Sequence, residues 1–450
     1  MFVSSMYLSK YSSLKKKFEK KKATIGVVGL GYVGLPLAVM FAEAGFKVYG
    51  VDISVQIIES LNKGSSHVGD VKDQKLLDLM EGNSVNKICF TSDYSALKSC
   101  DGIVICVPTP LSKTGNPDMR YVRDAGENIS SNMSAGTLII LESTVYPGAT
   151  QEMLLPLIEE RSEDHLVIGE NVFLAFSPER IDPGRSDWNL RTTPKVIGGI
   201  TSRCTDLAVE LYGATLNTVV PVSSTRIAEM VKLLENTFRA TNIALANELA
   251  IMCDRLNIDV WEVIDAASTK PFGFMPFYPG PGIGGHCIPI DPQYLSWKMK
   301  QLDYDARFIS LAEEINSSMP LFVLEKSQKA LVAIGKTLSS SKIIVLGVTY
   351  KPDIADIRES PALDVIKLFI EEGAEVVYND PYVQKLELEE GHQLQSLGIT
   401  AGNLAQIDVA IIVSDHSSYD FEYLSTCVDL IVDSRNATQG LSLSCEVVKI

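Results

Sequence analysis

From Ala23 onward, short apolar runs alternate along the chain with stretches in which apolar side chains recur every three or four residues. The runs have the length of buried strands and cover residues 24–28, 46–51, 102–107 and 137–141. Between the first two runs, Leu35, Val39 and Ala42 recur at helical spacing. Because strands that alternate with helices form a parallel, doubly wound sheet, the sequence predicts an α/β domain over residues 23–205.

The middle of the chain carries one long helical pattern. Residues 225–256 contain neither Gly nor Pro, and Ile227, Val231 and Leu234 are among the apolar residues that fall on one face. Its length predicts a helix that connects two domains or two subunits. We assign it to a central helical domain over residues 206–328, which also contains a Gly/Pro-dense loop, 271–292.

The last third of the chain repeats the pattern of the first. Residues 342–382 read strand, loop, helix, Gly, strand and acidic end, and 408–416 and 428–436 contain two further apolar runs. The sequence therefore predicts a second Rossmann-like domain over residues 329–450. Its first turn lacks the second and third glycines of a dinucleotide site, which makes it a poor pyrophosphate site. The expected fold is α/β, with two Rossmann-like doubly wound domains joined by the long central helix.

Length and composition fit this division. The 450 residues carry a net charge of −16, and 46% of them are hydrophobic, which is enough for several cores. The acidic balance argues against nucleic acid as a partner, but helix N-termini still allow phosphate binding. Eight scattered cysteines without a C-x-x-C pair fit neither a metal site nor a disulfide framework, so we expect a cytoplasmic protein that needs no metal. No apolar run is long enough for an integral membrane segment.

The first 22 residues differ from the rest in charge. They hold seven Lys and one Glu, and no apolar segment of a secretory signal follows the basic part. We expect a solvated, disordered tail over residues 1–22. The alternative is an arm that binds a membrane or a partner.

A glycine motif follows the first predicted strand. Residues 29–34 read Gly-Leu-Gly-Tyr-Val-Gly, and an aspartate ends the next strand 18 residues after the last glycine. Such glycines let the backbone approach a pyrophosphate at the helix N-terminus, and the acid accepts hydrogen bonds from ribose hydroxyls. The pattern predicts NAD as the cofactor rather than NADP. The residues assigned to it are Gly29, Gly31, Tyr32, Val33, Gly34 and Asp52.

Two polar segments, VPTP and ESTVYPG, each follow an apolar strand of this domain. Ligands on doubly wound sheets bind at the carboxyl ends of the strands, so Thr109 and Thr144 are placed to contact cofactor or substrate. For either threonine, the alternative is an ordinary turn residue without such a role.

The most distinctive segment is the loop 278–291, which reads YPGPGIGGHCIPID. Its four glycines allow the backbone to wrap closely round a ligand. Cys287 stands in this loop beside His286 and four residues before Asp291, which makes it a candidate nucleophile. From spacing alone, a small buried cysteine is the alternative, and His286 is either a base or a residue that shapes the loop.

Six motifs occur in the order in which a known enzyme family has them: the glycine motif, VPTP, ESTVYPG, KLLENTFRA, GPGIGGHCIPID and TYKPDIADIRESP. On these motifs the chain resembles the UDP-glucose/GDP-mannose dehydrogenase family from Ala23 to its last residue. GGHC, in place of the GGSC of UDP-glucose enzymes, is similar to the branch that acts on UDP-N-acetylhexosamines. The stretch PFYPGPGIGGHCIPIDPQYL is most similar to UDP-N-acetylglucosamine 6-dehydrogenases, with UDP-N-acetylmannosamine enzymes as near neighbours.

The resemblance implies roles for individual residues. Cys287 matches the catalytic nucleophile, and Asp291 matches the acid that accompanies it. Lys232 and Asn236, four residues apart and so on one helix face, match the pair around the reacting C6 oxygen. Thr144 matches a residue near the cofactor and the reacting water. The other cofactor residues are Thr109 and Arg358, and the substrate-binding set is Glu179 (also catalytic), Arg180, Ile181, Lys232, Asn236, Arg239, Gly284, Tyr350 and Lys351.

The chain departs from the family pattern at two places. UDP-glucose enzymes carry a second Glu four residues after the one that matches Glu179, whereas this chain has Pro183 there. A water-activating role borrowed from that second Glu therefore does not transfer. The stretch PFGFMPFY also lacks the Arg by which family members commonly reach into the partner subunit's site.

The resemblance implies an NAD-dependent, four-electron oxidation of a UDP-sugar at C6, by way of a thiohemiacetal and a thioester on Cys287. It also implies a homodimer or dimer-based oligomer, and a product used as a precursor of surface polysaccharide. UDP-N-acetylglucosamine is the favoured substrate, and UDP-N-acetylmannosamine or UDP-glucose is the alternative. Three competing functions stay open: a two-electron dehydrogenase of the hydroxyacid type, an epimerase that oxidises transiently, and a non-catalytic nucleotide-sugar sensor.

Overall fold

The computed structural model of the chain describes residues 2–81, 88–112, 114–160, 166–180, 189–388, 391 and 393–450, with the backbone alone for residues 2–9 and 81. These residues form two compact units, Met1–Glu235 and Asn236–Ile450. The division falls inside one helix, α8 (Thr225–Leu256), whose bounds are those that the sequence predicts.

The first unit is built on an eight-stranded sheet with the strand order β3-β2-β1-β4-β5-β6-β7-β8. Its strands are β1 (Thr24–Val28), β2 (Lys47–Val51), β3 (Ile88–Thr91), β4 (Gly102–Ile105), β5 (Leu138–Leu141), β6 (Phe173–Phe176), β7 (Lys195–Gly199) and β8 (Val219–Val222). All neighbouring strands are parallel except β6 and β7. The predicted doubly wound sheet is confirmed, and it continues beyond residue 205, the predicted end of the domain.

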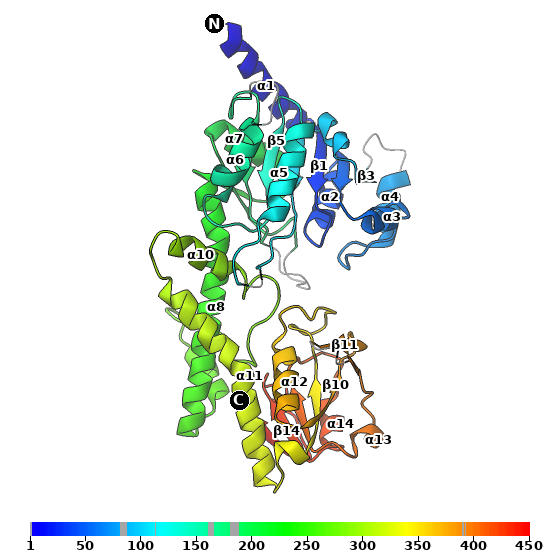
Figure 1. Cartoon of the computed structure of the whole chain (residues 1–450), viewed down its shortest axis with the longest axis vertical. Helices are drawn as coiled ribbons and strands as arrows, with labels where there is room; N and C mark the ends of the chain where they lie inside the picture. Colours follow the sequence, from blue (N-terminus) through cyan, green and yellow to red (C-terminus); the bar gives the residue numbers. More distant parts are fainter. Residues whose placement is uncertain are drawn as a thin grey trace. The chain divides into compact units, whose positions relative to one another are not determined.

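Helices cover both faces of this sheet. Successive strand residues point to opposite faces, and Val27 and Val28 of β1 accordingly belong to two separate core clusters. The helical segments of the unit, drawn in blue to green in Figure 1, are α1 (Phe2–Glu19), α2 (Gly34–Glu43), α3 (Val55–Asn62), α4 (Asp73–Glu81), η1 (Tyr94–Ser99), α5 (Arg120–Asn132), η2 (Thr150–Leu154), α6 (Leu155–Glu160) and α7 (Ser202–Gly213).

The basic N-terminal segment is a helix and not the solvated, disordered tail that its composition predicts. Leu14 and Phe18, one helical turn apart, are buried in the core of the first unit. Lys17 Nζ forms an ion pair of 2.6 Å with Asp101, and Lys10 donates to a backbone carbonyl at 3.3 Å. Burial of one apolar edge therefore orders this segment, even though most of its lysines remain exposed.

The second unit contains the rest of α8, further helices and a five-stranded parallel sheet of order β10-β9-β13-β14-β15. Its strands are β9 (Lys342–Leu346), β10 (Glu375–Asn379), β13 (Val409–Ile412), β14 (Leu430–Asp433) and β15 (Glu446–Lys449), and a small hairpin pairs β11 (Lys385–Glu387) with β12 (Gln393–Gln395). Its helical segments are α9 (Val260–Ser268), α10 (Asp291–Lys300), α11 (Arg307–Ala333), η3 (Leu338–Ser340), α12 (Pro361–Glu371), α13 (Ala401–Leu404) and α14 (Phe421–Ser425). The predicted second Rossmann-like domain is thereby confirmed.

Two kinds of feature are absent from the described residues. No helix in the ranges given above is long and apolar enough to cross a membrane. Within the same ranges, no group of three or more His, Cys, Asp or Glu side chains could hold a metal ion.

Candidate active site

The glycine turn between β1 and α2 has the geometry of a dinucleotide site. Gly29 has a φ of +89°, and a Cβ there would lie 2.6 Å from the carbonyl oxygen of Cys106. A Cβ on Gly34 would overlap the carbonyl oxygen of Gly29, whereas one on Gly31 would have nothing within 4 Å. The first and third glycines thus let α2 pack against the turn, and the second leaves open the backbone that a pyrophosphate approaches. NAD fits these residues.

Asp52 follows β2 and faces the same turn. Its two carboxylate oxygens accept backbone N–H groups from Leu30 at 2.8 Å and from Ser54 at 2.9 Å. A carboxylate offers about four acceptor positions, so Asp52 keeps capacity for the ribose hydroxyls of a nucleotide. Tyr32 and Val33 lie in the turn itself, and Tyr32 is 42% exposed.

Thr109 and Thr144 are brought to the same edge of the sheet, because they follow the neighbouring parallel strands β4 and β5. Both are half-buried. The turn after Thr144 is fixed by Glu229 of α8, whose carboxylate accepts the backbone N–H groups of Gly148 at 2.5 Å and Thr150 at 2.9 Å. Burial raises the pKa of Glu229. The sequence carries no signal for this buried acid, because its partners lie about eighty positions away.

A buried ion cluster surrounds Glu179. Lys195 of β7 places its Nζ 3.0 Å from a carboxylate oxygen of Glu142 and 3.0 Å from one of Glu179. Glu142 also accepts a hydrogen bond from the Tyr212 hydroxyl. Burial raises the pKa of Glu142. Burial alone would lower the pKa of Lys195, but the two carboxylates outweigh it and leave that pKa above its ordinary value. Lys195 is therefore a permanent ammonium that holds Glu179 in place.

The neighbouring Arg180 ties this segment to the central helix. Its guanidinium donates to both oxygens of Glu235, at 3.2 and 2.6 Å, and to the carbonyl of Pro194 at 2.7 Å. Glu235 lies on α8 between the two predicted catalytic residues Lys232 and Asn236. In the first unit, the Glu179–Arg180 segment and the Lys232 turn of α8 are thus held together, and Lys232 is only 9% exposed.

In the second unit, Cys287 stands in a turn that opens α10. Its carbonyl accepts the backbone N–H groups of Ile290 at 3.2 Å and of Asp291 at 2.8 Å. Asp291 is the first residue of α10, is 2% exposed, and accepts a hydrogen bond of 2.6 Å from the Asn236 side chain. Cys287 itself is half-buried. The structure therefore joins Asn236 to the Cys287 turn through Asp291.

The glycines before Cys287 pack against the loop that follows β9. A Cβ on Gly284 would lie 2.6 Å from the Cβ of Tyr350, and one on Gly285 would lie 2.8 Å from its ring. The N–H of Gly285 donates to the carbonyl of Arg358 at 3.0 Å. The Arg358 guanidinium bonds the Asp356 carboxylate at 2.6 Å and lies 3.2 Å from Nδ1 of His286. These contacts favour a shaping role for His286.

A buried amide pair anchors the start of the same loop. Asn247 of α8 accepts the N–H of Gly280 at 2.9 Å and donates to the side-chain oxygen of Asn316 at 2.8 Å. Asn316 in turn donates to the carbonyl of Ala240 at 3.1 Å. Sequence reasoning missed this pair, because an Asn within a long helical pattern reads as an ordinary polar position.

The predicted site residues fall into both units. Those in the first are Gly29, Gly31, Tyr32, Val33, Gly34, Asp52, Thr109, Thr144, Glu179, Arg180 and Lys232, and those in the second are Asn236, Arg239, Gly284, Cys287, Asp291, Tyr350, Lys351 and Arg358. Arg239 occupies an exposed position of α8. Ile181 and Pro183 lie outside the residues that the structure describes.

Comparison with known proteins covers most of the chain. Residues 23–216, 226–318 and 344–440 match the NAD binding domain, the central domain and the UDP binding domain of the UDP-glucose/GDP-mannose dehydrogenase family. The UDP-N-acetyl-D-mannosamine dehydrogenase of Yersinia pestis is 38% identical over 406 residues, which are 88% of this chain and 94% of that protein.

Solved structures agree with this match. The UDP-D-ManNAc dehydrogenase of Pyrococcus horikoshii superposes with a TM-score of 0.85 at 34% identity, over 95% of this chain and 99% of that one. The NDP-N-acetyl-D-galactosaminuronic acid dehydrogenase of Methanosarcina mazei Go1 superposes with a TM-score of 0.79 at 30% identity, over 94% of both chains.

Proposed function

This chain belongs to the UDP-glucose/GDP-mannose dehydrogenase family, and from that membership we propose that it oxidises the C6 alcohol of a UDP-N-acetylhexosamine to the carboxylate. NAD is its cofactor, and the glycine turn and Asp52 fit that cofactor. The observation that carries the proposal is the hydrogen bond from Asn236 to Asp291 at the turn that presents Cys287.

Cys287 is the nucleophile of the proposed reaction. When bound, NAD would supply the hydride acceptor for two successive oxidations at C6, one molecule of NAD for each. After the first, the Cys287 thiolate attacks the aldehyde carbon and forms a thiohemiacetal. After the second, the carbon is held as a thioester, and water breaks the C–S bond to release the carboxylate and restore the thiol. Covalent capture keeps the reactive aldehyde on the protein.

Lys232 and Asn236 stabilise the negative charge that develops on the reacting oxygen at C6. Lys232, or a water beside it, takes the proton of the C6 hydroxyl, and the ammonium and the amide then stabilise the oxyanion of the thiohemiacetal. The Asp291 carboxylate orients the Asn236 amide, because it accepts one of the two amide hydrogens. Removal of one such oxyanion donor typically lowers the rate by about 10²–10³.

We propose Glu179 as the base for the hydrolytic water, beside Thr144. Lys195 holds the Glu179 carboxylate at 3.0 Å, so a proton taken from water is received by a fixed acceptor. This assignment does not require the second Glu of UDP-glucose enzymes, whose position is Pro183 here.

The relatives favour UDP-N-acetylmannosamine as the substrate. The protein from Y. pestis and the structure from P. horikoshii both carry that specificity in their names, so we place this sugar ahead of UDP-N-acetylglucosamine, which the sequence motifs favour. UDP-glucose is the third candidate. The product would serve as a precursor of surface polysaccharide.

The proposal is tested by NADH production on a panel of UDP-ManNAc, UDP-GlcNAc, UDP-GalNAc, UDP-glucose and GDP-mannose. We expect two NADH per sugar consumed, with the uronic acid identified by mass spectrometry. Cys287→Ser should abolish sustained turnover to the carboxylate, while Cys445→Ser, at another half-buried cysteine, should not. One NADH per sugar would indicate a hydroxyacid-type dehydrogenase, and no net NADH would indicate an epimerase or a sensor.

We also propose a cytoplasmic homodimer. The eight cysteines are scattered along the chain without a C-x-x-C pair, which fits a reducing compartment. On α8, Leu245, Met252 and Leu256 are 56%, 47% and 65% exposed, and a second copy of the chain would cover them. Light scattering should give twice the chain mass of 49.2 kDa, and a monomer at micromolar concentration would contradict the proposal.

A further inference from the structure

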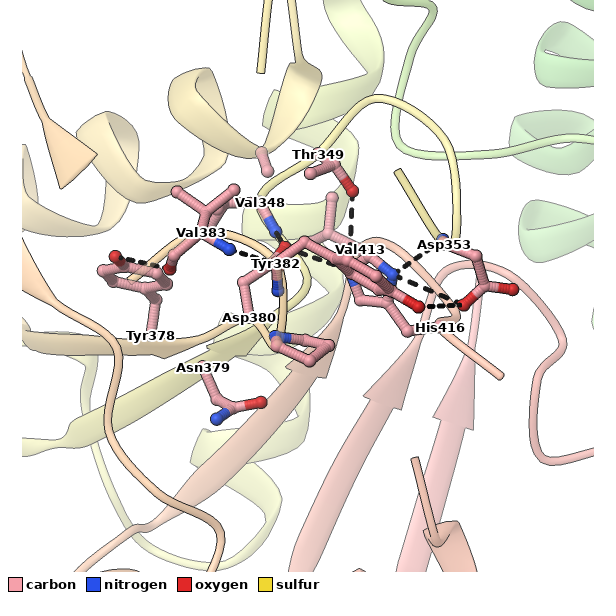
Figure 2. A network of polar contacts seen from close by, with 12 residues as sticks. Val348, Thr349, Asp353, Tyr378, Asn379, Asp380, Tyr382, Val383, Val413 and His416 are labelled. Carbon is pink, nitrogen blue, oxygen red and sulfur yellow. Dashed lines mark hydrogen bonds and ion pairs between the residues drawn. The ribbon is translucent and has the colours of Figure 1, made fainter. Parts of the chain in front are cut away.

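A buried histidine that the proposed mechanism does not use stands after β13. His416 is 1% exposed. Its Nε2 lies 2.9 Å from Oδ2 of Asp380, and its Nδ1 accepts a hydrogen bond of 2.9 Å from the backbone N–H of Asp353 (Figure 2). The imidazole therefore connects the end of β10 to the loop that follows β9.

These two bonds fix the tautomer of His416. A backbone N–H can only donate, so Nδ1 carries no proton, and Nε2 must carry the proton and donate it to Asp380. The Asp380 carboxylate also accepts the backbone N–H groups of Val348 at 2.8 Å, Tyr382 at 2.8 Å and Val383 at 3.1 Å. Four bonds fill the acceptor capacity of a carboxylate, so the His416–Asp380 pair is held in one orientation.

Asp353 is the residue that this pair anchors. Its φ of +62° lies in the left-handed region that residues with a side chain rarely adopt. Its Oδ1 accepts hydrogen bonds from the N–H of Ser417 at 2.9 Å, from the Ser417 hydroxyl at 3.0 Å and from the Tyr382 hydroxyl at 3.3 Å (Figure 2 shows Tyr382 beside it). The strained turn is thus held at both its backbone and its side chain.

The same turn carries the candidate substrate residues. Tyr350 and Lys351 precede Asp353 by three and two positions. The Tyr350 ring packs against Gly285 of the Cys287 loop, and the N–H of Gly285 donates to the carbonyl of Arg358 in the loop after β9. Displacement of the turn would therefore move both the substrate residues and the glycines that precede the nucleophile.

We propose that His416 is a positioning residue for UDP-sugar binding. It acts through the Asp353 turn, and that turn sets the place of Tyr350 and Lys351. The inference rests on the proposed function, because it takes these two side chains as substrate contacts. A residue that only stabilised the fold would change the melting temperature and leave the affinity of the folded protein for UDP unchanged.

Two substitutions of His416 separate its bond to Asp353 from its bond to Asp380. In His416→Asn, the amide oxygen replaces Nδ1 as acceptor for the Asp353 N–H, and in His416→Gln, the amide reaches toward Asp380 in place of Nε2. We expect His416→Gln to weaken UDP binding about tenfold, the effect of one lost hydrogen bond, and His416→Asn to retain most of the affinity. Calorimetric titration of the full chain with UDP measures this, and KM for the UDP-sugar should rise more than kcat falls.

A second pair of variants leaves the buried pair intact. Tyr382→Phe removes one hydrogen bond from Asp353, and Tyr423→Phe removes one from the backbone of Ala401; each tyrosine is 41% exposed. Tyr382→Phe should weaken UDP binding, and Tyr423→Phe should not. If the unaltered protein does not bind UDP, the proposed function fails. If the unaltered protein binds UDP, and the folded His416→Gln and Tyr382→Phe proteins bind UDP as tightly as it does, the positioning role is overturned. If His416→Gln does not fold, the affinity of Tyr382→Phe for UDP decides alone.

Discussion

Substitution of Gly34 by Ala should weaken NAD binding without unfolding the first domain. The new Cβ would overlap the carbonyl oxygen of Gly29 and lie 3.1 Å from the Cβ of Cys106. Both neighbours belong to the packed junction of β1, β4 and α2, so the helix must move away from the turn by on the order of 1 Å. A hydrogen bond of about 2.9 Å from the helix N-terminus to a pyrophosphate oxygen is lost at that displacement. One such bond to a charged group contributes about 1.5–3 kcal/mol, so the Kd for NAD should rise about 10- to 150-fold.

Fluorescence or calorimetric titration with NAD measures this effect. Gly213→Ala is the matched control, because Gly213 ends α7 of the same domain and a Cβ there would have nothing within 4 Å. The control should bind NAD like the unaltered protein. Both variants should keep the circular dichroism spectrum of the unaltered protein, which shows that the first domain is folded. A folded Gly34→Ala protein whose Kd for NAD equals that of the control would refute the reasoning.

Three further predictions concern buried polar groups. Lys195→Met leaves Glu142 buried without its cation and should cost about 3–5 kcal/mol in denaturant titration, part of which Glu142→Gln should restore in the double variant. Asn247→Ala leaves a buried N–H of the Cys287 loop unpaired and should cost about 1–3 kcal/mol. Asn242→Ala, which removes a solvent-exposed hydrogen bond to a carbonyl of the same helix, should cost far less, and equal losses would contradict this account. Burial raises the pKa of Glu229, so this residue stabilises the fold most below the ordinary carboxyl pKa of about 4.3. Its contribution to stability falls as the pH rises through the raised pKa. Over that pH range, the melting temperature of the unaltered protein should decline more than that of Glu229→Gln.

The fold is predictable wherever its signal is local. Buried parallel strands are continuous apolar runs, and α8 lacks any breaker residue, so the sequence predicts both correctly. The predicted end of the first domain is too early because β8 is an edge strand. Its residues are exposed or half-buried, and it contains Pro221, so it shows no buried apolar run. The prediction of a disordered tail over residues 1–22 is wrong. Leu14 and Phe18 do show helical spacing, but two apolar residues are too weak a signal against the lysine-rich composition.

In the candidate site too, residues with a local sequence signal are predictable, and residues that depend on distant partners are not. Cys287, Asp291 and the glycines stand in one short segment whose composition alone singles it out. The groups that hold the site are not visible in the sequence, because their partners are distant in the chain: Lys195 lies 53 positions from Glu142. A charged residue within a short strand has no pattern that marks it as buried. Such pairs become evident only when the sheet places β5 and β7 on either side of β6.

The two Rossmann-like domains use one backbone arrangement for different purposes. Asp52 and Asp380 each follow the second strand of their domain. Each accepts the N–H of the residue after the turn glycine, Leu30 or Val348, and the N–H of the residue two positions after the aspartate itself, Ser54 or Tyr382. Asp52 keeps acceptor capacity for a ribose. Asp380 is fully buried, and His416 and a further backbone N–H fill its remaining positions. Since the second turn also lacks two of the three glycines, removal of His416 alone would not create a dinucleotide site there. Which domain can bind a dinucleotide therefore depends on the turn after its first strand and on the surroundings of the aspartate after its second strand. It does not depend on the parallel strand arrangement around the turn, which the two domains share.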